Sequence, residues 1–400
     1  DPEQLALTID LTRWLFPFVI LVSLVSYCEG ILNHRGHFFV PKIAPGLVSL
    51  SVVAAAVCLG GVMKVPIQSL VVGVLAGGLL HLLIQLPLLV ARWRLPRLRL
   101  DFSPRFKRFM GEMGKVVLIG IFAQINIMVL RLLASFLPAG AVSHYWNANR
   151  LVDLTQGMIG VGLGSAIMPV LARAVAEERW SDVRGHLVYS LRLACFVLLP
   201  SVLFVTAFRV PLVAMLYRHG SFTWQDTLIT ADTLMLLAPF LLAVAGINIV
   251  KKVYFALDDR NTLLAVGAAG VVLTATLGFI LIRSMAVRGL ALALSLSTAA
   301  QLAAYFMLLR RKVSTAVRAG DILPGIGRMA AACLPAALVL YLLAAAGDWT
   351  RGPTRCINIL LFTGGVVGSV AGYLGCAYLL RIPELRELSG MLRRKRRRGA

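Results

Sequence analysis

One long apolar stretch of the sequence contains an arginine and an aspartate three residues apart. Arg150 and Asp153 both lie within the apolar window 142–172. A charge inside a membrane-spanning helix is costly, so it needs either a partner or a water-filled cavity. Residues at i and i+3 share one helix face, which places these two side chains within salt-bridge reach. The spacing therefore predicts either a substrate-binding site or a structural ion pair that neutralises itself.

A second arginine lies in the preceding apolar window, 114–136. Gln124 and Arg131 are seven residues apart, which predicts one polar face on this helix. The short connection 137–141 makes the two helices antiparallel neighbours. With a rise of about 1.5 Å per residue, Arg131 and Arg150 would lie roughly 9 and 13 Å below this connection and could share one cavity. Guanidinium groups suit forked phosphate contacts, and the alternative is that Arg131 snorkels to the interface.

Other arrangements of chemically active residues have simpler interpretations. The six cysteines are scattered singly through apolar segments, as small buried residues would be. Gly160 and Gly164 form a GxxxG pattern, which favours close helix packing, because no strand precedes it to make a nucleotide-binding turn. The sequence contains neither a Ser/His/Asp set nor a metal-ligand cluster. We therefore expect a protein that is not an enzyme and has no cofactor, with a coupling cation left open.

Composition places these residues in a membrane protein. Of the 400 residues, 59% are hydrophobic and only 14% are charged. The net charge of +22 does not indicate a nucleic-acid partner, because the basic residues lie between apolar runs of about twenty residues. An all-α polytopic protein with about eleven transmembrane helices is predicted. The apolar windows are 12–33, 41–62, 66–91, 114–136, 142–172, 186–207, 228–250, 262–282, 289–309, 326–347 and 356–380.

The distribution of basic residues between these windows predicts the orientation. One alternate set of loops holds 26 Lys and Arg residues and the other set holds 6. The positive-inside rule makes the first set cytoplasmic, so residue 1 is periplasmic and the C-terminus is cytoplasmic. The basic tail, 393–398, would attract anionic lipid headgroups by about 1 kcal/mol per residue. The basic set is 34–40, 92–108, 173–185, 251–261, 310–325 and 381–400.

Several short motifs are spread over nearly the whole chain. They include Pro17-Phe18, Gly30-Ile31-Leu32-Asn33, Ala134-Ser135-Phe136-Leu137-Pro138, Asn149-Arg150-Leu151, Met168-Pro169, His219-Gly220-Ser221-Phe222-Thr223 and Tyr254-Phe255-Ala256-Leu257-Asp258-Asp259. Together these motifs resemble the MurJ (MviN) family of the multidrug/oligosaccharidyl-lipid/polysaccharide exporter superfamily. They follow one another in the family's order, which makes them specific as a set.

The resemblance implies a fourteen-helix transporter with two lobes around a central cavity. The eleven windows would then be helices four to fourteen, and the chain is expected to lack the first three. Residues 1–108 would complete the N-terminal lobe and a basic linker, and residues 109–310 would form the C-terminal lobe. Two additional helices would follow in 311–380, and 381–400 would be a cytoplasmic tail.

The resemblance also implies a function. The family moves lipid II, a peptidoglycan precursor linked to a polyprenyl pyrophosphate, from the cytoplasmic to the outer leaflet of the bacterial inner membrane by alternating access. Arg150 matches a family arginine on helix eight and Asp153 stands where an acidic residue is expected, whereas Asn149 replaces a usual Asp and Arg131 is an unusual cation. The predicted substrate-binding set is Arg150, Asp153, Arg131, Gln124 and Asn149. The alternatives are a polysaccharide or cation-coupled drug exporter, and a scaffold that transports nothing.

Overall fold

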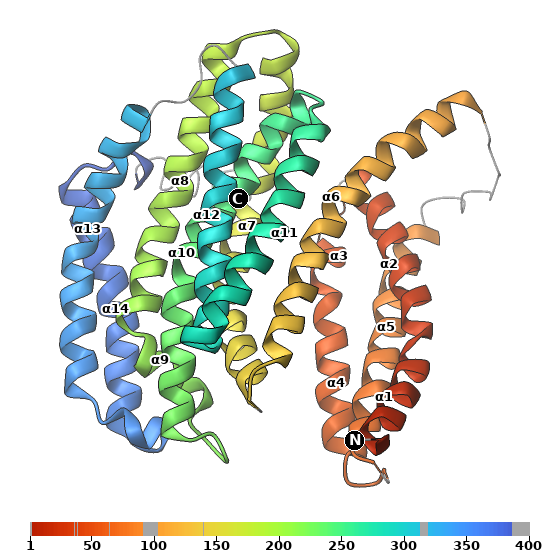
Figure 1. The fold of residues 1–400 in the computed structure, drawn as a ribbon, viewed down its shortest axis with the longest axis vertical. Helices are drawn as coiled ribbons and strands as arrows, with labels where there is room; N and C mark the ends of the chain where they lie inside the picture. Colours follow the sequence, from red (N-terminus) through yellow and green to blue (C-terminus); the bar gives the residue numbers. More distant parts are fainter. Residues whose placement is uncertain are drawn as a thin grey trace. The chain divides into compact units, whose positions relative to one another are not determined.

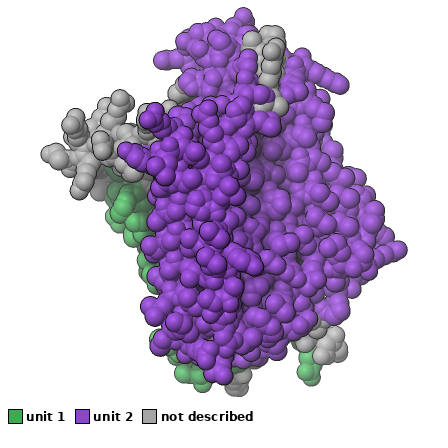
Figure 2. All heavy atoms as spheres, turned by 90° about the vertical axis from the view of Figure 1, so that its left-hand side faces the viewer, with its two compact units in different colours: residues 1–103 green, residues 104–400 purple. Residues whose placement is uncertain are grey.

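A computed structural model describes residues 2–35, 37, 39–63, 65–90, 103–138, 140–312 and 319–385 of the chain. Every regular element in these ranges is a helix, so the predicted all-α fold class is confirmed. The chain divides into two compact units, residues 1–103 and 104–400 (Figure 2). The domain boundary predicted at residue 108 falls inside helix α6, which begins at Pro104. The basic tail lies outside the described residues from 386 onward.

The first unit is a small helical bundle in which small residues allow two helices to approach closely. Helices α4 and α5 pack along each other. A Cβ atom placed on Gly73 would lie 2.7 Å from the Cα of Val52, and one on Gly77 would lie 2.6 Å from the Cα of Val48. Backbones this close need glycine at the contact. The elements are α1 (Pro2–Leu15), α2 (Pro17–His34), α3 (Phe39–Ile43), α4 (Pro45–Leu59) and α5 (Ile67–Val90).

The second unit is organised around one central helix, α10, which contacts α7, α8, α9, α11 and α12 (Figure 1). Helices α13 and α14 pack on each other and lie beside α8. Tyrosine hydroxyls cross-link the bundle: Tyr254 on α10 donates to the Tyr305 carbonyl at 2.7 Å, and Tyr373 on α14 donates to the Phe196 carbonyl at 2.7 Å. The elements are α6 (Pro104–Ser135), α7 (Ala141–Ala176), α8 (Trp180–Ala207), α9 (Arg209–Tyr217), α10 (Trp224–Ala256), α11 (Arg260–Met285), α12 (Val287–Lys312), α13 (Ala319–Ala346), the 3-10 helix η1 (Trp349–Thr354) and α14 (Cys356–Leu379).

The helices agree with the predicted windows, with two local differences. Ten stretches in the described chain are long and apolar enough to cross a membrane, and the 36-residue α7 occupies the window predicted at 142–172. The first stretch begins at Leu5, earlier than predicted, and is divided into α1 and α2 at Pro17. Proline at the first position of a helix needs no N–H partner, which accounts for this break. The connection predicted at 208–227 contains the short helix α9.

Gly289 lets the first turn of α12 approach the last turns of α11. A Cβ atom there would overlap the carbonyl group of Leu281, and Gly289 is buried. We expect Gly289→Ala to lower the free energy of unfolding by about 1–3 kcal/mol, as overpacking of a tight contact does. The melting temperature of the purified protein in detergent measures this effect. Gly375→Ala on α14 is the control, because no atom lies within 4 Å of its Cβ position. An equal decrease in melting temperature in the two variants would contradict the prediction.

Candidate functional site

The second unit contains a polar cavity of about 380 Å³ between α6, α7, α10, α11 and α12. Its apolar lining is expected for a membrane bundle, but amide and charged side chains enter it from four of these helices. Polar groups inside such a bundle mark a route or site for a polar ligand. These side chains are Asn126, Asn149, Asp153, Gln156, Asn248, Lys251 and Gln301.

Helix α7 presents two predicted residues to this cavity. Asn149 Nδ2 donates to Asp153 Oδ2 at 2.9 Å, a contact between residues one helical turn apart. Asn149 is half-buried and Asp153 is exposed, so this bond leaves the carboxylate accessible from the cavity. A carboxylate has about four acceptor positions, of which Asn149 uses one. Asp153 is therefore available to hydroxyl, amide or cationic donors of a ligand.

Two buried amide atoms near this carboxylate have no hydrogen-bond partner in the described chain. They are Oδ1 of Asn126 on α6 and Nε2 of Gln156 on α7, both in side chains that line the cavity. Leaving a buried donor or acceptor unsatisfied costs about 1–3 kcal/mol each. A water molecule or a polar ligand in the cavity would supply both partners. The cavity thus offers one unpaired acceptor, one unpaired donor and a carboxylate.

Lys251 is one of the cavity residues that the sequence did not predict, and the others are the amides Asn126, Gln156, Asn248 and Gln301. The sequence placed it in the predicted cytoplasmic loop 251–261, but α10 continues to Ala256 and Lys251 is half-buried in the cavity wall. Asn248 lies one turn earlier on the same helix and lines the same cavity. The two polar residues are three positions apart in an apolar run, and this spacing could have indicated a polar helix face that includes Lys251. Asp153 and Lys251 give the wall one charge of each sign.

The other predicted residues do not line this cavity. Gln124, Arg131 and Arg150 have exposed side chains. The guanidinium of Arg131 lies 5.0 Å from the centre of the Trp146 ring, which is a cation–π contact. Burial raises the pKa of the Tyr217 phenol and the charge of Arg150 opposes that rise, which places Arg150 near α9.

The predicted ion pair between Arg150 and Asp153 is therefore corrected. Among the ion pairs of the described residues, neither Arg150 nor Arg131 is joined to Asp153. The carboxylate is bonded instead to Asn149, four residues earlier on α7, while Arg131 is held by an aromatic ring. The two arginines do not share the 380 Å³ cavity with Asp153.

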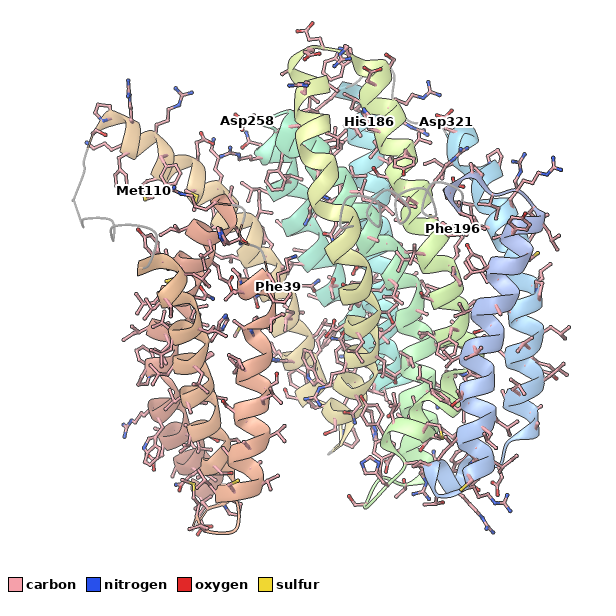
Figure 3. All side chains as sticks on the ribbon, turned by 180° about the vertical axis from the view of Figure 1, so that it is seen from behind. Phe39, Met110, His186, Phe196, Asp258 and Asp321 are labelled. Atoms are coloured by element: carbon pink, nitrogen blue, oxygen red, sulfur yellow. The ribbon has the colours of Figure 1, made fainter. Side chains whose placement is uncertain are left out.

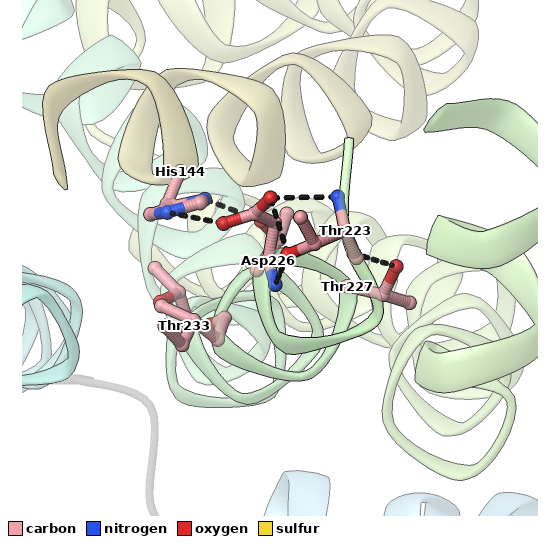
Figure 4. Close-up of polar contacts among 7 residues, drawn as sticks. His144, Thr223, Asp226, Thr227 and Thr233 are labelled. Carbon is pink, nitrogen blue, oxygen red and sulfur yellow. Dashed lines mark hydrogen bonds and ion pairs between the residues drawn. The ribbon is translucent and has the colours of Figure 1, made fainter. Parts of the chain in front are cut away.

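A polar cluster at the start of α7 fixes this helix against α10 (Figure 4). His144 Nε2 lies 3.4 Å from Asp226 Oδ1, and His144 Nδ1 lies 3.2 Å from Thr230 Oγ1. Asp226 also accepts the Thr223 backbone N–H at 2.7 Å, which completes a capping box at the start of α10. His144 thus joins the start of α7 to α10, and the next turns of α7 carry Asn149 and Asp153.

The cavity supplies little for a metal ion. Asp153 is its single carboxylate, and the part of the chain that the structure describes contains no group of three or more His, Cys, Asp or Glu side chains placed to hold one. What the cavity offers is hydrogen bonding to a polar ligand together with two opposite charges. This chemistry fits recognition of an uncharged or zwitterionic polar group.

Comparisons with known protein families and with curated proteins point to the same family. The family model described as "Lipid II flippase MurJ" matches residues 1–354. The lipid II flippase MurJ of Burkholderia cenocepacia is 27% identical over 317 residues, which cover 78% of this chain and 61% of that protein. The probable lipid II flippase MurJ of Bdellovibrio bacteriovorus is 27% identical over 394 residues, covering 96% and 73%. The chain spans 58–61% of the length of the first three such relatives.

Two solved structures resemble the fold. One is a lipid II flippase MurJ in an inward closed conformation, with a TM-score of 0.68, 19% identity, and coverage of 91% of this chain and 73% of that chain. The other is an inward-facing multidrug resistance MATE family transporter of the MOP superfamily, with a TM-score of 0.65, 16% identity, and coverage of 78% and 72%. At these identities the likeness concerns the fold alone.

Proposed function

Because the chain belongs to the lipid II flippase MurJ family, we propose that it moves lipid II from the cytoplasmic to the outer leaflet of the bacterial inner membrane for cell-wall synthesis. The observation that carries the proposal is the family match over residues 1–354. It is supported by ten apolar stretches in the described chain and by a polar cavity among them. The activity is transport, which needs binding groups and no catalytic residue.

The binding groups have distinct parts in this proposal. Sugar hydroxyls and amides of the headgroup would pair with Asp153, Asn126 and Gln156, whose free donors and acceptors suit them. The pyrophosphate would be held by Arg150, an exposed guanidinium on the same helix as Asp153. Membrane potential or a coupled cation would drive the cycle.

The proposal is tested by transport and by growth. The chain is expressed in a strain depleted of its lipid II flippase, alone and in a chimera that supplies the part of the Burkholderia cenocepacia relative outside the match. Proteoliposomes containing the active form should expose labelled lipid II to an added probe. A drug or polysaccharide exporter would give export of those substrates without exposure of lipid II, and a scaffold would give neither result.

A cavity-filling pair of variants distinguishes transport through this unit from an indirect effect. Ala123 lines the cavity from α6, and Ala371 is exposed on α14 outside it. Ala123→Phe should inhibit lipid II exposure, whereas Ala371→Phe, with the same added volume, should not. Equal activity of both variants would count against a substrate route through the cavity.

The proposed orientation gives a labelling prediction. In a cysteine-free background, a membrane-impermeant thiol reagent added from outside should label Ser221→Cys and Thr350→Cys. It should not label Ser103→Cys or Gly320→Cys until the membrane is permeabilised. The reason is the excess of Lys and Arg in the loops that contain the second pair. External labelling at 103 or 320 would reverse the assignment of sides.

A further inference from the structure

A second, smaller pocket lies away from the polar cavity, between α8, α13 and the residues that follow α14. Its volume is about 110 Å³, and its charged lining consists of Arg192, Arg328 and Glu384. Asp321 and Phe196, labelled in Figure 3, mark the region where α13 and α14 meet α8. None of these three charged residues belongs to the proposed transport site.

The pocket lies at a membrane surface. Helix α14 has 24 residues, so it is about 36 Å long and crosses the hydrocarbon once. Glu384 follows its last residue, Leu379, by one short turn. The pocket is therefore at the level of the phospholipid headgroups.

Arg192 is held in place by neighbouring polar groups. Its Nη2 donates to the Asp321 carbonyl, and the Asp321 carboxylate accepts from both Nη2 and Nε of Arg184, at 2.6 and 2.7 Å from Nη2 and 3.1 Å from Nε. Gly325 leaves room for this guanidinium, since a Cβ atom there would lie 3.1 Å from Arg192 Nε. A pre-positioned guanidinium loses little freedom when it binds an anion.

Within the described residues, the two remaining charged groups of the pocket, Glu384 and Arg328, have no charged partner. Glu384 is only 4% exposed, yet within the described residues it has neither an ion pair nor a hydrogen bond, and the same is true of Arg328. No nitrogen of Arg192 or Arg328 forms an ion pair with the Glu384 carboxylate, although all three line one pocket. A carboxylate and two guanidinium groups that line one pocket without pairing make it complementary to a ligand that carries a cation as well as an anion.

From this charge arrangement we propose that the pocket binds the headgroup of phosphatidylethanolamine. The phosphodiester lies against Arg192 and Arg328, which donate charge-assisted hydrogen bonds to it. The primary ammonium lies against Glu384 and donates to its carboxylate. A choline headgroup has no N–H to donate, and a glycerol headgroup has no positive charge. Glu384 therefore selects between headgroups that share the same phosphodiester.

The test uses the purified full chain in detergent and three short-chain lipids as probes, namely dihexanoyl phosphatidylethanolamine, phosphatidylcholine and phosphatidylglycerol. Native mass spectrometry measures the dissociation constant of each. The ethanolamine lipid should bind about tenfold more tightly than the choline lipid, the size expected for one buried charge-assisted hydrogen bond. Glu384→Gln, which keeps the side-chain shape, should abolish this preference and leave binding of the choline lipid within about twofold.

Two further variants separate the pocket from general attraction to charge. Arg328→Gln should weaken all three lipids, because it removes a phosphate donor. Arg381→Gln removes the same charge from an exposed position that does not line the pocket, and should leave all three unchanged. An unchanged ethanolamine preference in Glu384→Gln would overturn the proposal. If phosphatidylglycerol bound most tightly of the three lipids, the proposal would also be overturned, because the pocket would then be a site for anionic lipids. Neither result depends on lipid II transport.

Discussion

Replacement of Arg150 by alanine is expected to abolish growth of the flippase-depleted strain at a protein level equal to that of the unchanged chain. Arg150 is exposed on α7, near Tyr217, and forms no ion pair with another described residue. Its guanidinium is therefore available for a pyrophosphate. Charge-assisted hydrogen bonds contribute about 1.5–3 kcal/mol each, so losing a forked pair reduces binding at least tenfold.

The conservative variant identifies the kind of contact that Arg150 makes. Arg150→Lys should restore growth only in part, because an ammonium is a point charge without the planar fork. Arg173→Ala near the end of the same helix is the control, since its exposed pair with Glu177 at 3.9 Å contributes little. Normal growth of Arg150→Ala would remove this residue from the binding site.

The second large effect on transport is expected from replacement of Asp153. Asp153→Asn keeps the shape of the side chain and the contact with α7, but removes the charge and half of the acceptor capacity. We expect the rate of lipid II exposure in proteoliposomes to fall at least about tenfold, as when a charged hydrogen-bond partner is lost. Asn149→Ala should cost less, because it removes one donor to the carboxylate and leaves the charge in the cavity.

Asp182→Asn is the matched control for Asp153→Asn. Asp182 is a half-buried carboxylate at the start of α8, paired with Arg179 at 3.0 Å and outside the cavity. Its neutralisation should leave transport unchanged. If Asp153→Asn transports as fast as Asp182→Asn, the carboxylate has only a local role in α7. The cavity would then depend on its amides and on Lys251.

The helices were predictable because their signal is local. Long apolar runs specify membrane-crossing helices whatever their neighbours are, and the windows agree with the observed elements apart from the early start of α1 and the short helix α9. Both exceptions are also local: Pro17 divides an otherwise continuous run, and α9 has only nine residues, too few to cross a membrane. A hydropathy profile alone shows neither the break at Pro17 nor the short helix α9.

The site was predictable only in part, because it depends on the rotation of helices about their axes. Asn149 and Asp153 were identified because one helix face carries both. The cation–π contact of Arg131 with Trp146 joins two helices, and the spacing within either one does not predict it. Lys251 was set aside because the end of α10 was placed too early. Partners such as Arg184 and Asp321, 137 residues apart, require the tertiary structure.

The placement of α13 and α14 has a consequence for biogenesis. These two helices pack on each other and reach the rest of the second unit through α8, α9 and η1, whereas α6, α7, α10, α11 and α12 enclose the polar cavity without them. Chains are synthesised from the N-terminus and domains fold in that order. The cavity can therefore close while the last hairpin is still on the ribosome. The hydrogen bond from Tyr373 to Phe196, which joins α14 to α8, forms only after that hairpin has been synthesised.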